Sequence, residues 1–150
     1  LLYARTAGVT ASTSPVPLTF RHIMSKLTIR LVKGEDFEGD MPTDAQVFIH
    51  NTVPTATVDI SAGVVTRSAK GARQTVRAYQ ESDFTFGAII VPQRLDNRVP
   101  FVEVIMKGVS YLFESKFLFK SGVNHLVNLV IDDNPENVKI DIGGEIENWQ

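Results

Sequence analysis

The side chains that could perform chemistry are few and far apart in this sequence. The histidines are His22, His50 and His125, and the chain contains no cysteine. A zinc site needs several convergent ligands, usually at short spacings, and a thiolate nucleophile needs a cysteine. We therefore expect no metal site, no thiol chemistry and no bound cofactor. His22 is expected to be a hydrogen-bonded strand residue beneath a loop.

Oxygen-bearing side chains alternate at Asp132, Asn134 and Glu136, a spacing that is also found in calcium-binding loops. Pro135 interrupts this run, and no helical pattern flanks it as it would in an EF-hand. The segment therefore favours a solvated turn over a calcium site.

Two glutamates, Glu103 and Glu114, flank an expected hairpin and could act as a pair in glycoside hydrolysis. That reaction needs two carboxylates at a fixed separation in a cleft lined by sugar-binding groups. The only tryptophan is Trp149, close to the end of the chain, and no Gly-x-Ser-x-Gly elbow or phosphate-binding glycine loop occurs. We predict no catalytic residue and no enzymatic activity.

A basic segment surrounds Gly71 and contains Arg67, Lys70, Arg73 and Arg77. Nucleic-acid binding usually requires a broader basic face with stacking aromatic residues, and the net charge of this chain is −2. We expect an exposed loop that is open to proteolysis, and no nucleic-acid partner.

Aromatic residues allow a second interpretation of the chain as a surface module that binds carbohydrate. Phe117 and Phe119 alternate, so a strand would place both on one face, and Tyr79 and Phe84 could extend that surface. Trp149 could also stack on a sugar, but burial of a tryptophan at the end of a domain is the favoured role, because an aromatic ring of that size usually lies in a core.

Length and composition indicate one folded domain. The chain has 150 residues, of which 43% are hydrophobic and 21% charged, values that are usual for globular proteins. No apolar run approaches the roughly 20 residues that span a bilayer. The chain begins without a signal peptide or initiating methionine, which suggests a fragment or a processed product. We expect residues 1–17 to be the end of a preceding domain with a linker, and 18–150 to form the domain.

The apolar pattern predicts an all-β fold, because no segment of twelve or more residues keeps a helical period. Short strands with frequent turn signals predict a β-sandwich of about 7–10 strands. The glycine of Lys107–Gly108 predicts a tight hairpin. Beyond the opening strand, the expected strands are 47–50, 56–60, 63–66, 75–79, 84–91, 99–106, 109–114, 124–131, 138–142 and 145–149.

In the first long strand, the earlier and the later apolar residues would point to opposite faces if the strand were unbroken. This pattern predicts a β-bulge near Ser25 and Lys26. Phe20, His22 and Met24 would otherwise face away from the later apolar residues. The expected core is Phe20, Leu27, Ile29, Leu31, Ile60, Phe86, Ile90, Val104, Tyr111, Phe113, Leu129 and Trp149.

Six short segments, spread over nearly the whole chain, match a known sequence pattern in the same order. They are 1–4, 20–27, 58–64, 88–93 with its Pro-Gln pair, 107–122 with its Lys-Gly hairpin, and 146–149. In this order they resemble the fimbrillin-like family of the Bacteroidetes, which includes type V pilins and Mfa-like proteins.

The resemblance implies a transthyretin-like or immunoglobulin-like Greek-key sandwich, with a second such domain upstream. It implies a lipoprotein precursor that is exported to the outer membrane and trimmed by a protease. The partners would be other pilin or adhesin subunits joined by strand exchange, with host or bacterial glycans or proteins as further ligands. The function would be fimbrial assembly and cell adhesion at the cell surface, and the membrane would be reached only through an upstream lipid anchor.

Overall fold

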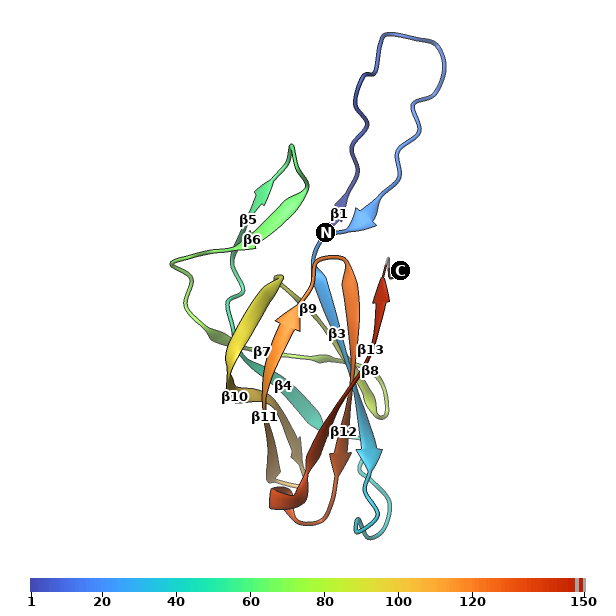
Figure 1. Ribbon diagram of the computed structural model, residues 1–150. Helices are drawn as coiled ribbons and strands as arrows, with labels where there is room; N and C mark the ends of the chain where they lie inside the picture. The colour runs from blue at the N-terminus through green and yellow to red at the C-terminus, as the bar shows by residue number, and fades with distance from the viewer. Residues whose placement is uncertain (148, 150) are drawn as a thin grey trace.

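The computed structural model describes residues 1–147 and residue 149. The chain forms a β-sandwich with two small two-stranded extensions at one end (Figure 1). No helix in the described residues is long and apolar enough to cross a bilayer. The strands of the sandwich are β3 (Ser25–Lys33), β4 (Gln46–Thr52), β7 (Gln74–Arg77), β8 (Tyr79–Ser82), β9 (Thr85–Ile90), β10 (Gln93–Met106), β11 (Val109–Phe119), β12 (Val123–Ile131) and β13 (Lys139–Glu147).

One sheet has five strands in the order β13-β12-β3-β9-β8. Its centre is β3, where Leu27, Ile29 and Leu31 alternate with polar residues and lie in the core. β12 has the same alternation and pairs parallel to β3, whereas the other pairs of this sheet are antiparallel. Alternation in two adjacent strands supplies one continuous apolar face, which is the condition for packing a second sheet.

The second sheet has four strands in the order β11-β10-β4-β7, and all of its pairs are antiparallel. The turn between β10 and β11 is the predicted Lys107–Gly108 hairpin. Both residues have positive φ, 50° and 73°, which is the backbone that a two-residue type I′ turn requires. The hairpin prediction is confirmed.

The expected strand 75–79 is divided between the two sheets. β7 pairs with β4 in one sheet, and β8 pairs with β9 in the other. Ala78 lies between them, is buried, and donates its N–H to the Val47 carbonyl at 2.9 Å. A small buried residue at this position lets the chain cross between the sheets.

Most of the predicted core is confirmed. Buried members are Leu27, Ile29, Leu31, Phe86, Ile90, Val104, Tyr111, Phe113 and Leu129. Phe20 and Ile60 were wrong predictions, because their exposed fractions are 60% and 78%. Phe20 lies outside the sandwich just before β2 (Arg21–His22), and Ile60 lies in the turn between β5 (Ala56–Asp59) and β6 (Val64–Arg67).

The predicted bulge at Ser25–Lys26 is also wrong. Ile23 and Ser25 are buried and share the parity of Leu27, so the inward face begins three residues before Lys26 without an extra residue. Ser25 occupies an inward position because its hydroxyl donates to the Lys120 carbonyl at 2.6 Å. Because Ser25 is polar, the sequence pattern did not show that the inward face continues from Ile23 to Leu27.

The end of the molecule that carries the N-terminus is built from two hairpin-like pairs. β1 (Leu2–Tyr3) pairs with β2, and β5 pairs with β6 (Figure 1). Tyr3 joins the pairs, because its hydroxyl donates to the Ile60 carbonyl at 2.6 Å and its ring lies against Gly63. The division into residues 1–17 and 18–150 and the Greek-key connectivity stay predictions.

Candidate assembly groove between two edge strands

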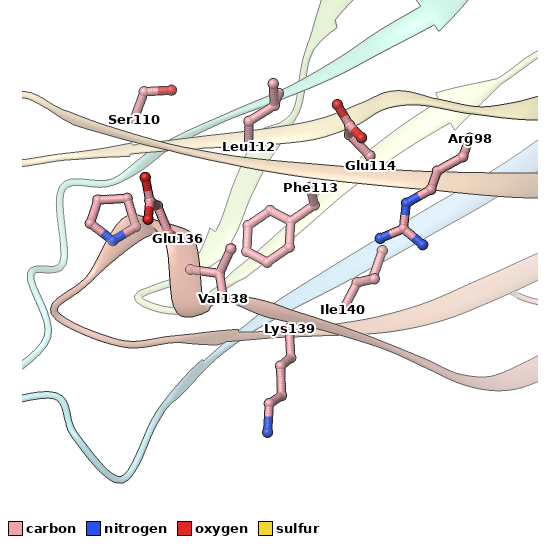
Figure 2. Close-up of a pocket in the computed structure, with 10 residues that line it drawn as sticks. Arg98, Ser110, Leu112, Phe113, Glu114, Glu136, Val138, Lys139 and Ile140 are labelled. Carbon is pink, nitrogen blue, oxygen red and sulfur yellow. The ribbon is translucent and has the colours of Figure 1, made fainter.

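β11 and β13 are the edge strands of the two sheets on the same side of the sandwich. Each is hydrogen-bonded along one side only within the described residues. A hollow of about 820 Å³ lies between them, lined by β11, by Arg98 of β10, by the short 3₁₀ turn η1 (Pro135–Asn137) and by the first part of β13 (Figure 2). A second hollow of about 300 Å³ lies between the later parts of the same two strands. We call the two hollows together the β11–β13 groove.

The wall of the groove on the β13 side combines three apolar residues with the charged residues Glu136 and Lys139. Val138, Ile140 and Ile142 alternate, so they point to the same face. Ile140 is paired with Leu129 and Ile142 with Val127, and both partners on β12 are fully buried in the core. The three residues therefore occupy the core-facing side of the sheet.

That core-facing side is incompletely covered along β13. Val138 and Ile140 are partly buried against the core, and Ile142 is 52% exposed. The opposite sheet ends at β11, which contributes Leu112, Phe113 and Glu114 to the other wall of the groove (Figure 2). The four-stranded sheet is thus one strand too narrow to cover the five-stranded sheet on this side.

A glycine pair shapes the second half of the groove. The pairing of β12 with β13 shifts register between His125 and Val127, opposite Gly143 and Gly144. A Cβ at residue 143 would lie 3.0 Å from the Leu126 carbonyl oxygen, so glycine permits this close approach. The bulge leaves Glu145 opposite His125.

His125 lies buried beside this part of the groove. Its ring meets the edges of Phe117 and Phe119, and its Nε2 accepts the Lys120 N–H at 2.9 Å. Burial lowers the pKa of His125 below its ordinary value, although the carboxylate of Glu145, 3.8 Å from Nδ1, opposes that shift. Lys120 and Glu145 form an ion pair with Nζ to Oε1 at 3.0 Å, which joins β13 to the turn after β11.

The three histidines lie in separate places, and the described part of the chain holds no group of three or more residues that could bind a metal. His22 is stacked on Trp149 with a ring separation of 3.6 Å. Trp149 is half-buried there and also lies near the Lys26 amine, so it covers the start of β3 and is not the core residue that was predicted.

The acidic and basic residues considered as candidate sites belong to turns and loops or lie apart from one another. Asn134 caps η1 by accepting the Glu136 N–H at 3.0 Å, so the predicted turn is present at Asp132–Glu136. Arg73 donates to the Asn51 carbonyl at 2.7 Å, and the basic segment includes the loop between β6 and β7. Glu103 and Glu114 line different hollows, which disfavours a paired role for them.

The aromatic surface predicted for carbohydrate binding does not form. Phe117 and Phe119 are 7% and 1% exposed, because they point inward and pack on Phe101 with ring separations of 4.8 and 5.9 Å. Phe84 is partly buried against the core, and Tyr79 alone of the four is exposed. Phe117 and Phe119 do lie on one face of the strand, as predicted, but that face points into the core.

A polar arrangement that the sequence did not reveal crosses the outer face of the four-stranded sheet. Ser110 donates to Glu103 Oε2, Glu103 Oε1 lies 3.0 Å from His50 Nε2, and His50 Nδ1 lies 2.8 Å from Thr75 Oγ1. The hydroxyl of Ser110 and the ring of His50 hold the pKa of Glu103 below its usual value. We call these four residues the polar row. The four residues are brought together only by the strand order β11-β10-β4-β7, so their spacing in the sequence does not indicate the polar row.

Comparison with known proteins agrees with the β-sandwich fold. A sequence model of the fimbrillin-like family matches residues 1–149. The solved structure of a proposed cell adhesion protein from Bacteroides ovatus is similar with a TM-score of 0.71 and 18% identity, over 94% of this chain and 50% of that one. A proposed cell adhesion protein from Bacteroides uniformis has a TM-score of 0.70 and 19% identity, over 90% and 54%. No curated protein matches.

The fold and the groove define a β-sandwich domain with two accessible sheet edges on one side. The chain belongs to the fimbrillin-like family. The chain spans about half the length of the solved structures it matches.

Proposed function

We propose that this chain is a domain of an exported subunit of surface fimbriae, which joins a neighbouring subunit by accepting a strand in the β11–β13 groove. The observation that carries the proposal is the incompletely covered core-facing side of β13 and the residue before it, at Val138, Ile140 and Ile142. An added strand would supply the missing cover.

Strand addition suits the chemistry of both walls. The free edges of β11 and β13 offer backbone groups for main-chain hydrogen bonds, and the alternating apolar residues offer pockets for alternate side chains of a donor. Full burial of one isoleucine side chain contributes roughly 1.5–3 kcal/mol, so a few such contacts would support a stable junction.

The role is structural, with no catalytic step. The family resemblance supports a lipoprotein precursor in the outer membrane, a second domain upstream and proteolytic trimming before assembly. The similar Bacteroides structures are described as proposed cell adhesion proteins, a role that would fit an exported subunit. Pilin or adhesin subunits are the proposed partners.

The test uses the full-length parent protein on native cells. We expect Ile142→Asp to abolish or strongly reduce the heat-sensitive ladder of multimers that sheared fimbriae give in SDS without boiling. In this variant, an incoming strand would bury the new carboxylate without giving it a hydrogen-bonding or charged partner. The free subunit should tolerate the substitution, because Ile142 is half exposed.

The matched control is Ile146→Asp, on the same strand. Ile146 is 47% exposed and is not among the residues that line the groove. The proposal requires a normal ladder for this control. A ladder of wild-type length in Ile142→Asp, or equal loss in both variants, would refute a role for the groove.

A further inference from the structure

Two hollows lie beside the polar row on the outer face of the four-stranded sheet. Their volumes are about 300 and 160 Å³, and they share Asn51 and Arg73 as lining residues. The larger also includes His50, Gln74 and Glu103, and the smaller includes Asp96 and Asn97 at the bend of β10. This surface meets the β11–β13 groove at Leu112, which borders both, and at Ser110 of the polar row, which also lines the groove.

The backbone around the hollows is locally irregular. Asn51 has φ of 64°, a left-handed conformation that costs energy for a residue with a side chain. It falls in a register shift of β4 between Ile49 and Thr52, and β10 has its own shift between Leu95 and Val99. Bulges of this kind redirect side chains and are frequent near binding sites.

The irregular backbone is held in place by side chains of the hollows. Asn51 Nδ2 donates to the Pro100 carbonyl at 2.7 Å, and Arg73 Nη1 donates to the Asn51 carbonyl at 2.7 Å. Arg73 is exposed and retains further N–H donors that can reach a ligand. The strained residue therefore lies between the two hollows with its conformation fixed from both sides.

The polar row fixes the remaining groups. Glu103 is bonded to Ser110 through one oxygen and to His50 through the other, so its carboxylate has one orientation. Each carboxylate oxygen can still accept another hydrogen bond. Polar groups that are already ordered lose little conformational entropy on binding, which favours affinity for a small polar ligand.

We propose that this surface is a binding site for a neutral, hydroxyl-rich saccharide. Glu103, Asp96 and the Asn51 and Gln74 amides are suited to accept and donate hydrogen bonds to sugar hydroxyls. The half-exposed Leu112 and the ring of Pro100 offer an apolar surface to the C–H face of a sugar ring.

The charges around the two hollows suit a neutral glycan. The hollows contain two carboxylates, Glu103 and Asp96, and the single cation Arg73 among their described lining residues. His50 lies between Glu103 and Thr75 at the larger hollow. Arg94 pairs with Asp96 at 3.8 Å just outside the hollows, so the surface has no excess of positive charge to attract a ligand carboxylate or sulfate.

The experiment is a printed array of neutral and acidic glycans probed with the folded protein, followed by calorimetric titration of the strongest neutral oligosaccharide. We expect binding to a neutral glycan, and at least a tenfold increase in Kd for both Glu103→Gln and Arg73→Ala. Thermal unfolding would verify that the variants are folded.

A matched control separates binding from sheet stability. Arg77→Ala removes an exposed cation of β7 outside both hollows. It should retain wild-type Kd. The proposal is overturned if the array shows no neutral glycan, if acidic glycans bind more tightly, or if Arg73→Ala and Glu103→Gln bind like wild type.

Discussion

At the scale of single residues, this domain depends on buried polar side chains that bond to the backbone. Gln93 is buried, and its amide nitrogen donates to the carbonyls of Val53 and Val91, both at 3.0 Å. Its Oε1 accepts the Val53 N–H at 2.9 Å. One side chain therefore replaces a strand partner for the segment that follows β4.

Replacing Gln93 by leucine should lower the free energy of unfolding by about 2–4 kcal/mol, because buried backbone groups lose their partners. Urea unfolding of the purified domain measures this difference. Gln46→Leu is the matched control, since Gln46 is exposed on β4, and it should change stability by less than about 0.5 kcal/mol. Equal effects for the two variants would contradict the assigned role.

His125 should make stability dependent on pH. Burial lowers its pKa in the folded protein below the ordinary value of 6.5, so the unfolded chain takes up a proton first as pH falls. The stability that neutral His125 contributes is complete above about pH 6.5 and is lost as pH falls through its folded pKa. Lys120 also opposes the charged ring, whereas Glu145 favours it.

Unfolding experiments at several pH values between about 8 and 5 test this effect, with a slope of at most roughly 1.4 kcal/mol per pH unit for one proton. His125→Gln should show a smaller decrease in stability below about pH 6.5 than wild type, because it removes the ring whose pKa is lowered on folding. Parallel curves would show that His125 does not titrate differently on folding.

At the scale of elements, alternation predicted strands well where both ends were marked by turns. The segments 84–91 and 124–131 correspond closely to β9 and β12, and the Lys107–Gly108 hairpin was correct. Alternation could not show that the chain changes sheets at Ala78, because the local pattern continues through that residue. It could not assign a face either, so the alternative interpretation as a carbohydrate-binding module placed Phe117 and Phe119 on a surface, although they lie in the core.

The hairpin turn offers a direct test of backbone conformation. Gly108→Ala should cost about 1–2 kcal/mol, because φ of 73° is unfavourable for any residue with a Cβ, although no atom lies within 4 Å of the added carbon. Gly144→Ala is the matched control, since that site is equally open and has no positive φ. Chemical unfolding should separate the two variants, and equal stabilities would contradict the type I′ assignment.

At the scale of the whole molecule, the sequence could predict the fold class and the family, but not the groove. The groove depends on β11 and β13 ending their sheets on the same side, and sheet order is set by pairings between distant segments. The resemblance suggested strand exchange, and the exposed core-facing residues of β13 now suggest where it would occur.

The central claim is that a neighbouring subunit fills the β11–β13 groove, and site-specific photo-crosslinking in assembled fimbriae tests it most directly. A photoreactive residue would replace Ile142 in the full-length protein, with Ile146 as the matched position, and mass spectrometry would identify the captured peptide. We predict that position 142 captures one extended segment of another subunit and that position 146 does not. Capture by position 142 only of segments from its own chain, or equal capture at both positions, would contradict the claim.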